Sequence, residues 1–237
     1  MSAPVQDALR RAAVYRVLAG AFAYPAPAML EEIRSTAAMA AGIEPSPAVA
    51  GALRVMARAA GEGEAVPLSE AYVTLFERGT ACPPYEGAYG VPQMSGKAAQ
   101  LADIGGFYTA FAMTPAPAQR DVEDHIGVEL DFMAALALKE AWAHAADAGE
   151  GLEIVRAAAR AFLDDHLARW ADAFAARVLQ TPAPDFYSAA ATLLAAWLRD
   201  ECGRLGVVPR PLGGPQPPDD GAAFTCPMAT GGVREGE

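Results

Sequence analysis

The chain has 237 residues, of which 53% are hydrophobic, and its formal net charge at pH 7 is −11. This hydrophobic share excludes an intrinsically disordered protein, and the length suffices for one large domain. The acidic balance argues against binding to nucleic acid, whose phosphates need a basic surface. Much of the hydrophobic content is alanine and β-branched runs are scarce, so the composition predicts an all-α fold.

The cysteines indicate a reducing compartment. Cys82, Cys202 and Cys226 are an odd number at unrelated spacings. They match neither a disulfide framework nor a zinc motif. We therefore expect a cytoplasmic protein.

The N-terminal segment allows two interpretations. Arg10-Arg11 precedes an apolar stretch, and residues 21–23 resemble a cleavage site, as in a twin-arginine export signal. Arg16, however, interrupts the apolar stretch, and apolar residues recur at helical spacing through it. We predict an amphipathic first helix rather than an export signal. No run approaches the ~18–20 apolar residues that a membrane span needs.

Apolar periodicity and Pro or Gly breakers predict a single bundle of seven or eight helices. The first four cover about Val5–Ala23, Ala28–Ala41, Pro47 to the breaker at 61–63 (with Ser46 as N-cap), and Leu68–Phe76. After a loop over 77–94, the others cover about Ser95–Met113, Asp121–Asp147, Gly151–Leu179 (with a bend) and Phe186–Leu205. The helical domain is expected to span 1–206, and the Pro- and Gly-rich segment 207–237 to be a flexible, irregular tail.

The start of the predicted helix 121–147 carries the most specific chemistry. Asp121 is its expected N-cap, and Glu123 and Asp124 place negative charge in its first turn, where the helix dipole favours it. His125 lies one turn before Glu129. An acidic residue and a histidine at such a loop-to-helix junction are expected to face a groove.

The stretch 72–89 predicts a second part of the same site. Tyr72, Leu75 and Phe76 share one helix face, and Pro83-Pro84 hold Tyr85 and Tyr89 on a stiff loop. Aromatic anchors of this kind bind apolar peptide segments. The alternative is that the loop tyrosines fold back onto the core, and composition alone favours this alternative.

Together, the motifs Y-x-x-L-F, P-P-Y-E-x-x-Y and E-D-H-I-x-x-E-L-x-F-M resemble those of the TorD/DmsD/NarJ family of redox-enzyme maturation chaperones. The resemblance covers about residues 10–205. It implies an all-helical, cytoplasmic chaperone, which binds the N-terminal, often twin-arginine, segment of a molybdenum oxidoreductase catalytic subunit before export. The residue patterns themselves indicate no catalytic site, and we expect no cofactor. Some members form domain-swapped dimers, so the resemblance leaves a homodimer open.

Matching motif positions, the resemblance implies a peptide-binding role for eight residues: Tyr72, Leu75, Phe76, Pro84, Tyr85, Glu86, Asp124 and His125. Two positions depart from the family pattern. Glu123 stands where proline is common before the Asp-His pair, and Tyr85 stands where several relatives have tryptophan. The chemistry agrees with the role, since carboxylates pair well with guanidinium groups.

Rival functions have weaker support. His125 and Glu129 have the spacing of two metal ligands, which makes an all-helical metal-dependent enzyme the alternative, but His144 and His166 are poorly placed to complete a site. A helical adaptor for another peptide is a third hypothesis.

Two further expectations concern single side chains. The tryptophans (Trp142, Trp170 and Trp197) are expected in the core, and the run 164–166, which ends in His166, on a solvated face.

Overall fold

The structure, a computed structural model, describes residues 1–77, 81–90, 96–113 and 123–214. Within these ranges it contains helices and no strand. The α-helices are α1 (Ala3–Ala21), α2 (Pro27–Ile43), α3 (Pro47–Glu62), α4 (Ala65–Tyr72), α5 (Gly96–Ala110), α6 (Ile126–Ala145), α7 (Gly149–Phe162), α8 (Ala168–Gln180) and α9 (Asp185–Leu205). The predicted all-α fold is confirmed.

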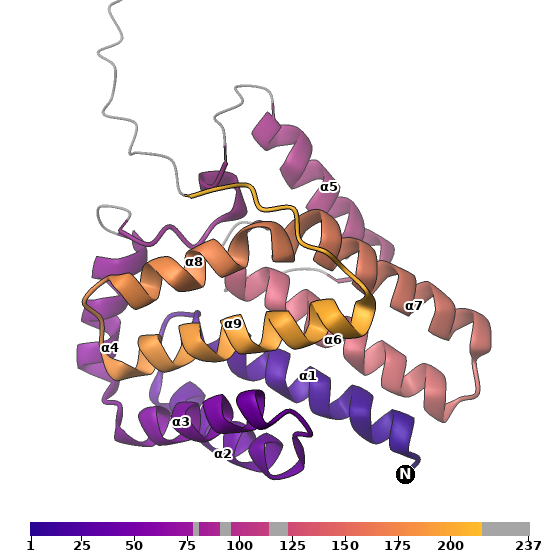
Figure 1. The fold of residues 1–237 in the computed structure, drawn as a ribbon, viewed down its shortest axis with the longest axis horizontal. Helices are drawn as coiled ribbons and strands as arrows, with labels where there is room; N and C mark the ends of the chain where they lie inside the picture. The colour runs from indigo at the N-terminus through magenta and orange to yellow at the C-terminus, as the bar shows by residue number, and fades with distance from the viewer. Residues whose placement is uncertain (78–80, 91–95, 114–122, 215–237) are drawn as a thin grey trace, which may run out of the picture.

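The helices form one bundle around a large hydrophobic core (Figure 1). α1 packs mainly against α6, α2 against α3, and α8 against α9. The largest fully buried side chains are aromatic, and they include Trp170, Trp197, Tyr15, Tyr187 and Phe22. In the part of the chain that the structure describes, no helix is both long and apolar enough to cross a membrane.

The N-terminal segment is part of this core. Arg11 is 3% exposed and donates to Glu140 on α6 at 2.5 Å and to Asp7 at 3.1 Å. Burial alone would raise the pKa of Glu140, but hydrogen bonds from Arg11 and Arg156 hold this pKa below its ordinary value. A buried, paired arginine fixes α1 against α6, as expected of a structural first helix.

The predicted start of the helix 121–147 is wrong. Asp121 lies outside the described residues, and residues 123–124 form a turn. α6 begins at Ile126, because His125 has an extended backbone (φ −75°, ψ 136°) and caps the helix itself. Its ring nitrogen Nδ1 accepts a hydrogen bond from the Gly127 N–H at 3.1 Å. Histidine therefore replaces aspartate as the N-cap.

Two helical stretches are interrupted by π-helical turns. The expected helix 68–76 ends as α4 at Tyr72 and continues as a π turn over Val73–Glu77. The expected helix 151–179 divides into α7 and α8 around a second π turn, Leu163–Leu167. Turns of this kind are rare in proteins, and those that occur are often found at functional sites. The bend was predicted; its π geometry was not.

Single side chains in the second half of the chain differ from their predictions. Trp170 and Trp197 are fully buried as expected, but Trp142 is 67% exposed, so its predicted core position is wrong. The prediction for the run 164–166 is wrong for His166, which is 3% exposed. Its neighbours Asp164 and Asp165 are partly exposed.

Residues 207–214 follow α9 without a helix and turn back across α8 (Figure 1). The Leu212 N–H donates to the Arg169 carbonyl at 2.9 Å, and the Gly90 N–H donates to the Gly214 carbonyl at 3.3 Å. Gly90 has a left-handed backbone (φ +88°), and a Cβ there would lie 3.2 Å from the Leu212 carbonyl oxygen, so only glycine fits. The rest of the predicted tail lies outside the described residues, and the domain division at 206 stays a prediction.

Candidate functional site

The second and third sequence motifs meet at one point of the structure, which we call the motif junction (residues 84–87 and 124–126). The Glu86 N–H donates to the Asp124 carbonyl at 2.9 Å, and the Ile126 N–H donates to the Pro84 carbonyl at 2.8 Å. Between them, Tyr85 and His125 form an isolated antiparallel bridge. Five of the eight predicted site residues are therefore brought together.

Local chemistry explains why the chain forms this junction. Pro83 and Pro84 have no N–H to donate, so they favour an extended approach, and residues 86–88 then form a 3-10 turn. The Gly87 N–H in this turn donates to the Asp124 carboxylate at 3.0 Å. The Tyr85 ring is half-buried and packs edge-on against His125, with ring centroids 5.3 Å apart.

Three carboxyl groups are buried behind the junction. Glu86 and Asp124 are each 1% exposed, and Glu129, one turn into α6, is fully buried. Glu129 accepts a hydrogen bond from the indole N–H of Trp170 at 3.2 Å. Within the described residues, one oxygen atom of each of these carboxyl groups lacks a hydrogen-bond partner. Buried unpaired acceptors are costly, which marks this cluster as a place that a ligand donor can satisfy.

The cluster changes the acidity of its members. Burial raises the pKa of Glu129 well above its usual range, and the nearby Glu86 and Asp124 raise it further, against the opposing hydrogen bond from Trp170. Burial also raises the pKa of Asp124, although the Gly87 N–H and the charge of Lys97 oppose this rise. Burial therefore disfavours the charged forms of Glu129 and Asp124.

His166 joins this cluster from the π turn. Its Nδ1 lies 3.1 Å from Glu86 Oε2, and its Nε2 lies 3.2 Å from the carboxylate of Asp103 on α5. The sequence held a signal for this position, because Phe162, His166 and Trp170 are four residues apart and the two aromatic side chains are fully buried. The prediction grouped His166 with Asp164 and Asp165 as one solvated run and did not use its spacing of four residues from Phe162 and Trp170.

The first motif forms a separate group, which we call the aromatic cluster (Tyr72, Leu75, Phe76 and the rings around them). The three side chains are between 3% and 4% exposed. The Phe76 ring lies 5.2 Å from Tyr72 and 5.3 Å from Tyr187, both in edge-to-face geometry. The Cys82 N–H donates to the Leu75 carbonyl at 3.0 Å and thereby connects the aromatic cluster to the loop that leads to the motif junction.

The two loop tyrosines differ in their surroundings. Tyr89 is 4% exposed, packs 5.2 Å from Trp170 between ring centroids, and donates its hydroxyl hydrogen to the Pro83 carbonyl at 3.0 Å. For Tyr89 the alternative of a tyrosine folded onto the core is confirmed. Tyr85 keeps part of its ring at the surface.

His125 and Glu129, the pair named by the alternative of a metal-dependent enzyme, lie at the junction and one turn into α6. The His125 Nδ1 is engaged as the helix cap, and Glu129 is bonded to Trp170. Across the described ranges, no group of three or more His, Cys, Asp or Glu side chains is arranged to hold a metal ion.

Comparison with known proteins gives one family. The model of the family described as nitrate reductase delta subunit matches residues 44–176 of the chain, a range that includes the three motifs. The chain is 37% identical over 79 residues to a chaperone protein TorD of Vibrio cholerae (strain O395), which covers 33% of this chain and 34% of that protein. It is 42% identical over 76 residues to a selenate reductase assembly chaperone protein of Thauera selenatis. This match covers 32% of this chain and 38% of that protein. These matches span about a third of the length of the curated relatives.

Proposed function

The chain belongs to the nitrate reductase delta subunit family, which includes TorD- and NarJ-like proteins, and on this premise we propose that it is a maturation chaperone. Its client is the catalytic subunit of a molybdenum oxidoreductase, whose N-terminal segment it binds while the apoprotein folds and receives its cofactor. The observation that carries this proposal is the motif junction, where residues from two distant motifs share backbone hydrogen bonds beside a buried acidic cluster.

The chemistry of the junction suits a segment with arginine residues. A guanidinium group has five N–H donors in a planar fork and pairs with carboxylates in bidentate geometry. The carboxyl groups of Glu86 and Asp124 each have an oxygen atom without a partner in the described chain. A net charge of −11 adds a long-range attraction for a basic segment. We propose that the segment carries a twin-arginine sequence and that binding precedes export from the cytoplasm.

The same burial sets a condition on binding. Leu75, Phe76, Asp124 and His125 are all less than 5% exposed, whereas Tyr85 is half-buried. A segment therefore contacts Tyr85 first, and the loop 81–90 has to move before the aromatic cluster can cover the apolar part of the segment. Hydrogen bonds from the Cys82, Glu86 and Gly90 N–H groups hold the loop to the rest of the chain, and a local opening that breaks them costs less free energy than global unfolding.

The proposal is tested by capture of the client and titration of its N-terminal peptide. Capture from the native host is expected to yield a molybdenum oxidoreductase subunit. The peptide is expected to bind wild type, and to bind Tyr85→Ala and Asp124→Asn at least about tenfold more weakly if each loses about 1.4 kcal/mol of contact. Asp172→Asn, an exposed aspartate on α8, is the control with the same change of charge.

The outcomes separate function from site. If the client is captured but both variants bind its peptide as wild type does, the chaperone function stands and the junction is not the site. If another protein's peptide binds instead, the chain is a helical adaptor. Circular dichroism of each variant establishes that a loss of binding does not reflect unfolding.

A further inference from the structure

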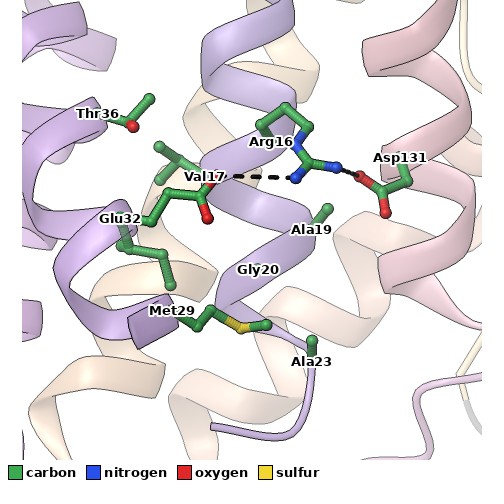
Figure 2. A pocket seen from close by; sticks show the side chains of 10 residues that line it. Arg16, Val17, Ala19, Gly20, Ala23, Met29, Glu32, Thr36 and Asp131 are labelled. Atoms are coloured by element: carbon green, nitrogen blue, oxygen red, sulfur yellow. Dashed lines mark hydrogen bonds and ion pairs between the residues drawn. The ribbon is translucent and has the colours of Figure 1, made fainter. Parts of the chain in front are cut away.

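A groove of about 300 Å³ lies where the second half of α1 meets the start of α2 and the first turns of α6 (Figure 2). We call it the α1–α2 groove. Its wall is apolar and includes Val17, Met29 and Ile33. Its rim is polar and carries Arg16, Glu32, Thr36 and Asp131. An apolar wall with acidic groups at its rim suits a ligand that combines an apolar part with a cation.

The rim already holds a guanidinium group. Arg16 Nη1 donates to Asp131 Oδ1 on α6 at 2.9 Å, and Arg16 Nη2 lies 3.7 Å from Glu32 Oε1 on α2 (Figure 2). The side chains of Arg16 and Glu32 are 54% and 65% exposed, and that of Asp131 is 25% exposed. Exposed ion pairs contribute little to stability, so another guanidinium can replace Arg16 at small cost.

The groove adjoins the motif junction. A Cβ atom on Gly127 would lie 3.2 Å from Nδ1 of the capping His125 and 3.3 Å from the carbonyl oxygen of Ala19, which lines the groove. Asp131 follows Gly127 by four residues, or about 6 Å along the helix. An extended segment that contacts the junction therefore reaches the groove within a few residues.

We infer that the α1–α2 groove binds an arginine of the client segment, with Glu32 and Asp131 accepting hydrogen bonds from its guanidinium and Met29 and Ile33 contacting a neighbouring apolar side chain. In the free protein Arg16 occupies the same two acceptors and competes with the client. The inference rests on the proposed function, because it concerns the partner bound at the motif junction.

Competition by Arg16 predicts opposite effects for the two sides of the ion pair. Arg16→Gln removes the competing positive charge beside Glu32 and Asp131, so affinity for an arginine-bearing peptide rises. Removing an acceptor by Asp131→Asn or Glu32→Gln lowers it. A purely structural ion pair would instead give effects of the same sign when either partner is removed.

The experiment titrates fluorescent peptides into the full-length protein. One synthetic peptide carries two consecutive arginines followed by a run of leucine and alanine; the other has glutamine in place of both arginines. Arg16→Gln is expected to bind the arginine peptide about two- to fivefold more tightly, and Asp131→Asn about two- to fivefold more weakly, the size expected for one exposed ion pair. Neither variant is expected to change binding of the glutamine peptide.

The neighbouring turn of α2 supplies matched controls. Glu31 and Arg34 form an ion pair with side chains 62% and 46% exposed, and neither lines the groove. Glu31→Gln and Arg34→Gln change the net charge as the groove variants do. They are expected to leave the affinity for both peptides unchanged, which separates a local contact from the long-range field.

Each result has one interpretation. Opposite shifts for Arg16→Gln and Asp131→Asn, confined to the arginine peptide, support the groove. Binding that depends on Tyr85 but not on the groove residues overturns the inference and leaves the proposed function intact. If the arginine peptide does not bind wild type and the captured client's own peptide does not bind either, the inference and the peptide-binding part of the proposed function both fail.

Discussion

The aromatic cluster and the three carboxyl groups behind the motif junction are equally buried, yet their energetics differ. Phe76 is surrounded by rings in favourable edge-to-face contacts, so its burial stabilises the fold. Glu86, Asp124 and Glu129 each have a carboxyl oxygen without a partner in the described chain, and burial raises the pKa of Asp124 and Glu129, so burying these groups costs stability. Carboxyl groups that destabilise the fold when buried, and that the packing of the core does not need, are candidates for a functional role.

The largest expected effect belongs to the aromatic cluster. Phe76→Ala removes a ring that contacts Phe22, Tyr72, Phe174 and Tyr187. We expect the free energy of unfolding to fall by about 3–5 kcal/mol, as for other buried phenylalanines. Urea denaturation followed by circular dichroism measures it. Tyr24→Ala, whose side chain is 56% exposed at the cluster's edge, is the control, and an equal loss there would contradict a packed cluster.

The next effect concerns the acidic cluster and depends on pH. The pKa of Glu129 is raised in the folded state, so the folded protein keeps a proton that the unfolded chain releases. The stability from this group is fully present below the ordinary glutamate pKa and is lost as pH rises towards the raised value. Wild type should lose up to about 1.4 kcal/mol per pH unit in this window through Glu129.

Glu129→Gln mimics the protonated carboxyl group and should remove that loss, so the variant becomes more stable than wild type as pH rises. Denaturation at several pH values above 4.5 measures the difference between the two profiles. In this variant the free energy of unfolding still falls somewhat with rising pH, because the pKa of Asp124 is also raised. Glu153→Gln on the exposed side of α7 is the control, and parallel profiles for wild type and Glu129→Gln would refute a buried, protonated glutamate.

The smallest effect is the coupling between Glu86 and His166, whose side chains lie 3.1 Å apart and are 1% and 4% exposed. A double-mutant cycle of Glu86→Gln and His166→Gln should give a coupling energy of about 1 kcal/mol. The exposed pair Glu31 and Arg34 should give a smaller coupling energy in the same measurement, because solvent screens it. Equal couplings would mean that the π turn brings His166 inwards without an energetic role.

The sequence predicts the helices better than it predicts the site. Proline and glycine determine several helix ends without tertiary help, as Pro47 and Gly63 do around α3. The start of α6 depends instead on the pairing of Tyr85 with His125 across 40 positions, which no local pattern contains. His166 points inwards because the helix widens into a π turn, and an ideal helical periodicity does not represent that change.

Motif matching placed Pro84, Tyr85, Glu86, Asp124 and His125 together, as the structure does. It did not separate them from Tyr72, Leu75 and Phe76, because a shared motif carries no information on burial. The role of all eight residues in peptide binding stays a prediction. Trp142 is exposed on a helix that is otherwise largely buried, and nothing in the structure explains why tryptophan occupies this position.

The long-range pairing of α1 has a consequence for how the chain folds as it is synthesised. Arg11 finds its partner Glu140 129 residues later, and the buried hydroxyl of Tyr15 donates to Glu201, 186 residues later, at 3.0 Å. At translation rates of ≈ 5–20 residues per second, Tyr15 waits roughly 10–40 s for that partner to be made. The packing of α1 is thus completed only when the chain has been made as far as α9, and the nascent chain exposes the apolar face of α1 during that interval.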